Sequence, residues 1–179
     1  MKKIMVLVSV VLSLSVVVCA QMTEGWYYDE ASHAWCKPPF NWQKTQLKGT
    51  VGSSQRFSEP QANAFVEFMS RAENPQATAE SVADAWEKDS KQFLPYLEKQ
   101  ISSSALDFTG GSGVLRQYEG SYYGTLLNAY VLYAVAHAKM YVVAGVFAKE
   151  KKAVYEPIVK KAVLSFRLIA PAQEKIAVE

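Results

Sequence analysis

The sequence predicts an α+β fold in which an antiparallel β-sheet of about six strands lies between helices. Three observations lead to this prediction. A long apolar run from Gly124 to Ala148 is rich in β-branched and aromatic residues, which favour strands. A short polar connection divides the run into two arms. Apolar residues at helical spacing occur both before and after the run.

The apolar run is either a membrane helix or a β-hairpin. It is long enough to cross a bilayer, which needs about 20 apolar residues. However, Lys139 lies near its middle, with His137 and Asn128 also inside it, and a central lysine costs roughly 2.5–3.5 kcal/mol on insertion. Residues 136–139 suit a hairpin connection, and both arms are apolar at odd and even positions, as in strands covered on both faces. We therefore expect a hairpin at the centre of the sheet.

Two segments have the spacing of helices that bury one face. The first begins near Asn74 or Thr78, which are competing N-terminal caps, and Pro95 interrupts or ends it. The second carries apolar residues over 154–166, and Pro157 fits its first turn. These segments are expected to cover the two faces of the sheet.

The other strands are expected to be short. The segments that favour them are 27–28, 33–36, 56–60, 64–71, 101–108 and 114–119. The stretch 46–55 is expected to be a loop, because it is rich in glycine and serine. The run from Gly110 to Gly113 is interpreted as a turn, since it lacks the lysine and the following helix of a phosphate-binding loop.

The N-terminus has the pattern of a signal peptide over residues 1–20, with a basic start, an apolar core and a small-residue exit. Cleavage after Ala20 would leave residues 21–179 as a single domain in the periplasm or the secreted space. Lipidation of Cys19 is the alternative, but Val18 precedes it where a small residue is normal. We expect no stable transmembrane span once the leader is removed.

Removal of this leader takes away two of the 19 basic side chains and none of the 17 acidic ones, so the formal charge falls from +2 to near zero. A neutral domain lacks the basic surface that nucleic acids attract, so no nucleic-acid partner is expected. Cys36 is then the remaining cysteine, and no intramolecular disulfide can form. We expect it to be buried, with a reactive thiol or a link between two chains as alternatives.

The sequence offers little that could carry catalysis. His33 and Cys36 have a spacing that metal sites use, but a structural metal would need two more ligands. The same two residues could form a nucleophilic pair, because partners in such a pair need only be close in space. The prediction is that the protein is not an enzyme and has no catalytic, metal or cofactor site, and a small hydrolase using Cys36 and His33 is the weakest alternative.

The N-terminal part of the predicted domain is unusually aromatic. This segment either packs against the sheet or forms a binding surface. The candidate binding residues are Trp26, Tyr27, Tyr28, Trp35, Phe40 and Trp42. A carrier that encloses a small apolar ligand between these residues and the sheet is therefore a second function hypothesis.

The C-terminal third has a distinctive order of elements. The expected strand MYVVAGVF is followed by the charged connection AKEKKAV and by a helix with Tyr155, Pro157 and the pair Ser165-Phe166. Near the N-terminus, Pro39 shortly precedes Trp42. With these features the sequence resembles the PsbP family, which includes DcrB-like envelope proteins. The resemblance implies an antiparallel sheet between helices and a function in binding. We therefore expect a non-enzymatic domain that binds a protein partner or assists assembly of an envelope complex.

Overall fold

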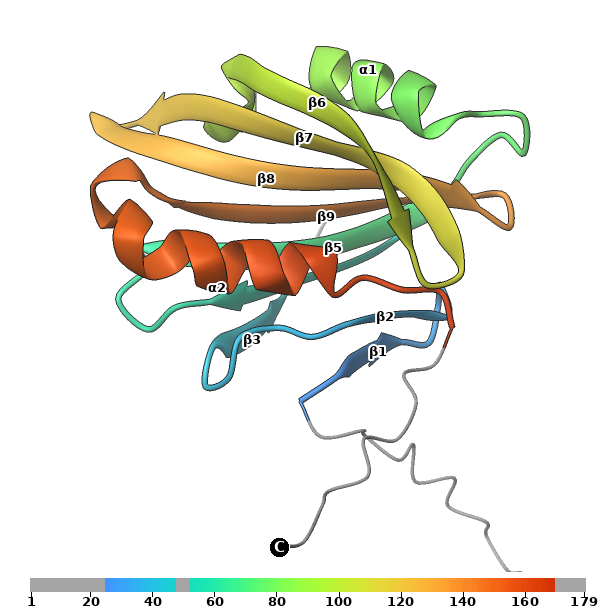
Figure 1. Ribbon diagram of the computed structural model, residues 1–179, viewed down its shortest axis with the longest axis horizontal. Coiled ribbons are helices and arrows are strands. Elements are labelled where there is room, and N and C mark those ends of the chain that lie inside the picture. The colour runs from blue at the N-terminus through green and yellow to red at the C-terminus, as the bar shows by residue number, and fades with distance from the viewer. Residues whose placement is uncertain (1–24, 48–51, 170–179) are drawn as a thin grey trace, which may run out of the picture.

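The computed structural model describes residues 25–47 and 52–169. These residues form a large antiparallel sheet, a separate two-stranded sheet and two α-helices (Figure 1). The predicted signal peptide, its cleavage position after Ala20 and Cys19 lie outside the described residues.

The large sheet has seven strands in the order β3-β4-β5-β9-β8-β7-β6, and each neighbouring pair is antiparallel. The sheet is therefore one strand larger than the predicted number of about six. The short edge strand β3 is polar and exposed along its whole length, so no apolar alternation marks it in the sequence. The strands are β3 (Gln43–Gln46), β4 (Ser53–Ser58), β5 (Ala64–Ala72), β6 (Lys99–Phe108), β7 (Gly111–Tyr122), β8 (Thr125–Ala136) and β9 (Lys139–Ala148).

The predicted central hairpin is present as β8 and β9. Ala136 pairs with Lys139, and the two residues between them, His137 and Ala138, have φ values of 52° and 55°. These left-handed conformations are those of a tight hairpin turn that matches the twist of the strands. None of the helices in the described ranges is long and apolar enough to cross a membrane.

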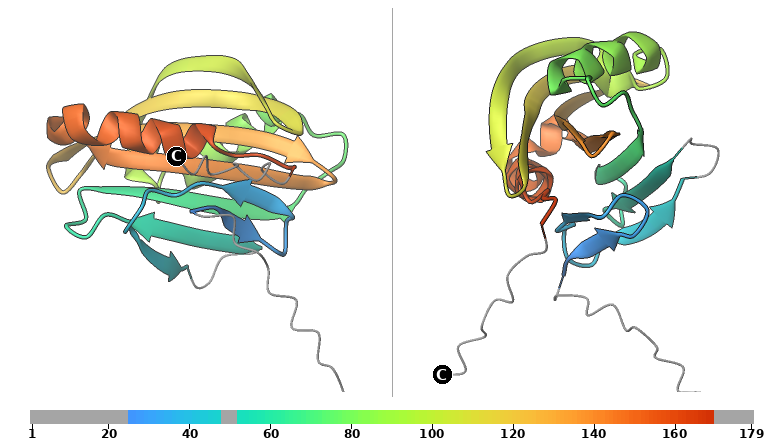
Figure 2. Two further views of the ribbon diagram at one scale, coloured as in Figure 1. Left: turned by 60° about the horizontal axis from the view of Figure 1, so that its bottom comes forward. Right: turned by 90° about the vertical axis from the view of Figure 1, so that its right-hand side faces the viewer.

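Both faces of the central hairpin are buried. Because successive side chains of a strand point to opposite faces, Leu132 packs with α2 and Val131 packs with α1. The two helices lie on opposite sides of the curved sheet (Figure 2). The helical elements are α1 (Ala79–Ser90), η1 (Pro95–Leu97), η2 (Lys149–Lys151) and α2 (Lys152–Leu164).

The two faces are not covered equally. Helix α2 packs along β9, β8 and β5 at the middle of the sheet, whereas α1 packs against β8 and β7. The expectation of a sheet enclosed by helices is therefore met only in part, because α1 lies over one side of its face.

The structure decides between the two expected starts of the first helix and changes the expected start of the second. The Thr78 hydroxyl accepts a hydrogen bond from the Ser81 amide at 3.1 Å, and the Ser81 side chain bonds back to the Thr78 amide. This reciprocal cap makes Thr78, and not Asn74, the start of α1. Helix α2 begins at Lys152, so Pro157 lies inside the helix and not in its first turn.

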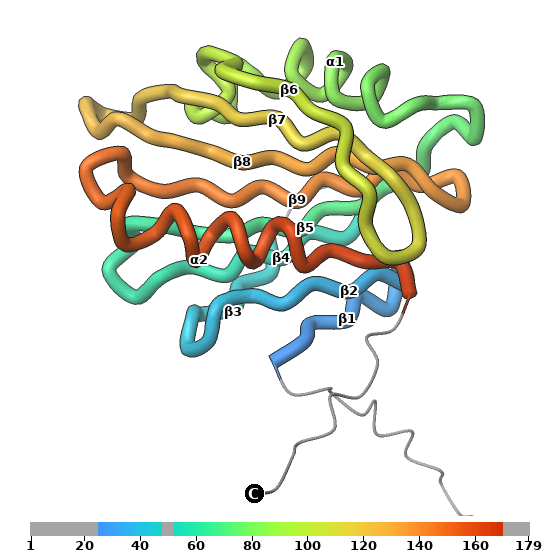
Figure 3. The backbone as a smooth tube through the Cα atoms, viewed as in Figure 1, coloured from blue at the N-terminus to red at the C-terminus, as the bar shows by residue number. Residues whose placement is uncertain are grey.

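A short hairpin of β1 and β2 forms the second sheet, as the sequence predicts (Figure 3). The buried Asp29 carboxylate fixes it to the large sheet by accepting a hydrogen bond from the Ser53 hydroxyl at 2.5 Å. Trp35 and Arg167 exchange two backbone hydrogen bonds, so the chain after α2 is tied to the hairpin. The strands are β1 (Tyr27–Asp29) and β2 (Ala34–Cys36).

Candidate binding groove beside the C-terminal helix

The six candidate aromatic residues do not form one surface. Tyr28 and Trp35 stack on each other with ring centroids 4.5 Å apart. Tyr27 instead makes edge contacts with Phe57 and Phe68, at 5.4 and 6.0 Å, and so joins the core. The remaining three candidates, Trp26, Phe40 and Trp42, line hollows beside α2.

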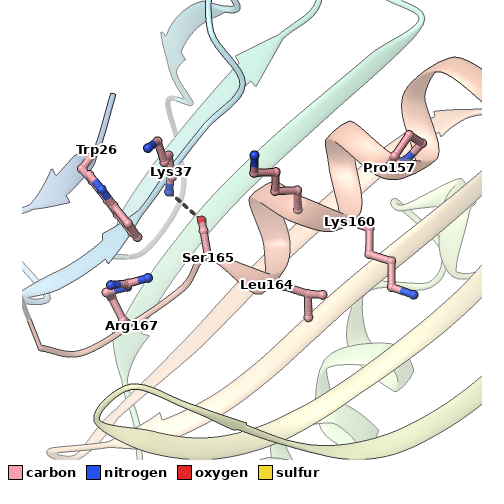
Figure 4. Close-up of a pocket in the computed structure, with 8 residues that line it drawn as sticks. Trp26, Lys37, Pro157, Lys160, Leu164, Ser165 and Arg167 are labelled. Atoms are coloured by element: carbon pink, nitrogen blue, oxygen red, sulfur yellow. Dashed lines mark hydrogen bonds between the residues drawn. The ribbon is translucent and has the colours of Figure 1, made fainter. Parts of the chain in front are cut away.

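Two adjoining hollows, of about 600 and 690 Å³, lie between α2 and the segment that follows β2. They share Lys37, Lys161 and Ser165, and together we call them the α2 groove. Figure 4 shows the hollow that is lined by Trp26 and Arg167. Each volume falls within the range of roughly 300–1,000 Å³ that is usual for ligand pockets. The lining residues are Gly25, Trp26, Lys37, Pro38, Pro39, Phe40, Trp42, Pro157, Ile158, Lys160, Lys161, Ala162, Leu164, Ser165 and Arg167.

Hydrogen bonds of the Ser165 side chain join the two walls of the groove. The Lys37 amide donates a hydrogen bond to the Ser165 hydroxyl at 2.6 Å, and that hydroxyl donates to the Ala162 carbonyl at the same distance. The two prolines after Lys37, Pro38 and Pro39, lack an amide proton and cannot extend β2. The segment therefore leaves the hairpin and faces the last turns of α2.

One part of the groove is apolar and open to solvent. Phe40 is 87% exposed, and Ile158 and Leu164 of α2 are 38% and 40% exposed. Trp42 is half-buried and makes an edge contact with Tyr155, with ring centroids 6.4 Å apart. An exposed phenylalanine beside exposed aliphatic side chains is typical of a surface that contacts a partner.

Both hollows of the groove also carry basic side chains. Lys37, Lys160, Lys161 and Arg167 line it, and none of the described lining residues is acidic. The Arg167 guanidinium lies 4.1 Å from the ring centroid of the buried Trp26, and its buried Nε has no hydrogen-bond partner among the described residues. These cations form no ion pair with carboxylates in the described part of the chain. They therefore remain available to an anionic group.

The groove contains neither of the residues proposed for catalysis. Cys36 is 1% exposed, and burial, followed by the nearby Asp29 charge, raises the pKa of its thiol from 9.0 to about 12. His33 is exposed, with Nδ1 2.7 Å from the Tyr28 hydroxyl oxygen. Within residues 25–47 and 52–169, no three His, Cys, Asp or Glu side chains are placed to hold a metal ion. The expectation of a buried cysteine is confirmed, and the absence of enzymatic activity stays a prediction.

The carrier hypothesis placed a ligand between the aromatic segment and the sheet. Protein side chains occupy that region, because Tyr27 packs on Phe68, and Phe68 stacks on Phe166 at 6.2 Å. Open volume lies instead between α2 and the segment that follows β2. The sequence did not indicate this arrangement, since it depends on pairing residues near 37 with residues near 165.

Comparison with known proteins supports the fold. No protein-family model matches this sequence, and no curated protein matches it in sequence. The solution structure of the cyanobacterial PsbP protein (CyanoP) from Synechocystis sp. PCC 6803 superposes with a TM-score of 0.59 at 15% identity, over 79% of this chain and 89% of that one. A crystal structure from Bacteroides thetaiotaomicron superposes with a TM-score of 0.52 at 10% identity, over 85% of this chain but only 50% of that one. With the sheet order and the two helices described above, these similarities show that the chain has a PsbP-like fold.

Proposed function

We propose that this protein is a non-enzymatic binding domain of the periplasm or secreted space, and that its α2 groove holds an extended segment of a partner protein. The observation behind this proposal is the combination of exposed apolar side chains and unpaired cations in one groove. The signal-peptide pattern supports the location, and the resemblance to the PsbP family, whose members act by binding, supports the role.

The charge of the groove indicates the chemistry of the partner. Lys37, Lys160, Lys161 and Arg167 would attract glutamate and aspartate side chains or a terminal carboxylate. The net charge of the chain without its leader is near zero, so this basic surface is local and not a property of the whole molecule. A segment with several acidic residues is therefore favoured over a neutral one.

The apolar part of the groove indicates a second requirement. Phe40, Ile158 and Leu164 offer aromatic and aliphatic surface that is already exposed to water. Burial of such surface stabilises a complex by about 25 cal/mol per Å² before the costs of association are subtracted. The preferred segment thus alternates acidic residues with leucine or phenylalanine.

A direct test measures binding of a fluorescent peptide in which glutamate alternates with leucine and phenylalanine. Charge reversal at K160E/K161E should weaken binding by about tenfold or more, because each lost charge contact is worth on the order of 1 kcal/mol. Binding to the original protein should weaken steeply as salt is added. F40A should weaken binding in a manner less sensitive to salt.

The matched control is K88E/K91E, which reverses two exposed lysines at the end of α1 on the opposite side of the sheet. This variant should bind the peptide as the original protein does, and melting temperatures should show that all variants fold. Equal loss in both double variants would show a general charge effect and would contradict binding in the α2 groove. Failure of the peptide to bind, even at low salt, would also count against the proposal.

A carrier of a small apolar ligand is the second candidate. The hollow that contains Phe40 and Trp42 favours it, since its volume of about 690 Å³ could enclose a drug-sized molecule. Native mass spectrometry of protein purified from its own host would distinguish the two roles. A stoichiometric co-purifying ligand that is lost in F40A would support the carrier.

A further inference from the structure

A second, smaller pocket lies on the opposite face of the sheet, beside α1. Helix α1 packs mainly against β7 and β8, and Trp86 projects from it toward the neighbouring strands β4, β5 and β9. A hollow of about 170 Å³ remains there, and we call it the α1-edge pocket. It is lined by Ser53, Ser54, Met69, Ser70, Arg71, Trp86 and Met140.

Strand pairing places four of these side chains on one face. Ser54 pairs with Met69, and Arg71 pairs with Met140. Directly paired residues of antiparallel strands point to the same side of the sheet, and both methionines belong to the core cluster that includes α1. The pocket thus has one hydroxyl, two thioethers and one guanidinium on its sheet side and an indole on its helix side.

Two residues that line this pocket have a buried hydrogen-bond donor with no partner in the part of the chain that the structure describes. Ser54 is 2% exposed, and its hydroxyl makes no hydrogen bond with the described residues. The buried indole Nε1 of Trp86 likewise has no partner among them. Native proteins normally satisfy such groups with a protein atom, water or a ligand. Because Ser54 and Trp86 both line the hollow, a ligand with acceptor atoms that enters it could satisfy the two donors.

Arg71 gives the pocket a positive charge at its mouth. Its Nε donates to the Met140 sulfur at 2.9 Å, which is a weak acceptor, and its guanidinium lies 5.7 Å from the Trp86 ring centroid. It forms no ion pair with a carboxylate among the described residues, and none of the described residues that line the pocket is acidic. The guanidinium can therefore bind an anion.

From this geometry we infer that the α1-edge pocket binds a small carboxylate with a short apolar body. Its carboxylate accepts hydrogen bonds from the Ser54 hydroxyl, the Trp86 indole and the Arg71 guanidinium. Its methylene and methyl groups contact the thioethers of Met69 and Met140. The pocket volume of about 170 Å³ suits a ligand of the size of a short-chain fatty acid.

Sodium butyrate is a suitable probe, observed through the indole N–H signal of Trp86 in two-dimensional ¹H–¹⁵N NMR spectra. We expect this signal to shift saturably with butyrate at millimolar concentrations. S54A and R71Q should each weaken binding at least fivefold, whereas S58A, on the same strand β4, should bind as the original protein does. Butyramide, which is similar in shape but uncharged, should bind at least fivefold more weakly than butyrate.

Each contrary result has a definite meaning. No saturable shift with butyrate would overturn the inference, and equal binding of butyrate and butyramide would overturn the assignment of an anion. The melting temperature of S54A without butyrate gives an independent readout. If the Ser54 hydroxyl is unpartnered until a ligand binds, S54A will be as stable as the original protein; a clear loss of stability would show that protein or water already satisfies it.

Discussion

The helices on the two faces of the large sheet are held in place by different interactions. On the α2 face, aliphatic and aromatic side chains pack closely, and Gly145 of β9 lets the helix approach the sheet. On the α1 face, charged groups take part: the buried Arg116 bonds to Glu80 and Asp84 at 2.5 and 2.8 Å, and also to Glu87. Apolar packing is thus the main interaction that holds α2 to the sheet, and an ion-pair network helps to hold α1 to the opposite face.

This difference has consequences for where ligands can bind. Close packing fills the space between α2 and the sheet, so the open groove lies beside the helix, between α2 and the segment that follows β2. The α1 helix is held over β7 and β8 by Arg116 and Tyr118, which leaves room beside it over β4 and β5. The α1-edge pocket is a result of that placement.

The largest effect is expected from a change at the tightest contact of the α2 face. A Cβ atom at Gly145 would lie 2.3 Å from Val159 Cγ1 and 2.8 Å from Val163 Cγ2, both on α2. G145A should therefore lower the free energy of unfolding by about 3 kcal/mol, measured by chemical denaturation. The double variant G145A/V159A should lose less than the sum of the single losses, because the smaller residue makes room. Additive losses would show that the approach of α2 to β9 is not limited by a contact between residues 145 and 159.

Removal of the Arg116 side chain tests how much its ion pairs contribute to holding α1 against the sheet. R116A leaves the partly buried Glu87 without its cation and should cost about 2 kcal/mol. We expect less than for a fully buried pair, because Glu80 and Asp84 are 58% and 72% exposed and can turn to water. Hydrogen exchange should become faster in α1 and remain unchanged in α2. Uniform acceleration in both helices would contradict a local role for this network.

The third prediction concerns pH and returns to the α2 face, where Cys36 is buried. Its pKa of about 12 in the folded protein exceeds the usual 9.0, so the native state keeps its proton while the unfolded state loses it. The contribution of the protonated Cys36 thiol to the free energy of unfolding is thus fully present below pH 9 and decreases as the pH rises from 9 to 12. Between pH 8 and 10 the original protein should lose about 1 kcal/mol more unfolding free energy than C36A. Parallel pH profiles for the two proteins would show that the thiol titrates normally.

Elements with a clear apolar pattern could be predicted from the sequence, and elements without one could not. The hairpin of β8 and β9 was predictable, because both arms are rich in β-branched and aromatic residues and a polar connection separates them. The PsbP-like arrangement followed from the strand, connection and helix near the C-terminus. By contrast, β3 carries no pattern, since an exposed edge strand of four polar residues has no buried face.

The candidate sites were harder to predict for a different reason. Three of the six expected aromatic residues line the α2 groove, but three of its four cations, Lys160, Lys161 and Arg167, lie on α2 and on the chain after it. The pairing of Trp35 with Arg167 brings these parts together, and no local pattern encodes contacts over such a distance in the chain. The α1-edge pocket likewise depends on register, because Ser54 is polar and would be expected at a surface.

The smallest effect is expected from the exposed acids around Arg116. E80Q and D84N should each cost about 0.5 kcal/mol or less at low salt, because both carboxylates are largely hydrated. The loss should disappear at high ionic strength, where exposed charges are screened. V159A on the α2 face should show a loss of unfolding free energy that is independent of added salt, since burial of apolar surface involves no charge. Urea denaturation of all variants at low and high salt distinguishes apolar packing on the α2 face from ion pairing on the α1 face. A salt-dependent loss in V159A, or a salt-independent loss in E80Q, would mean that the two helices are not held to the sheet by different forces.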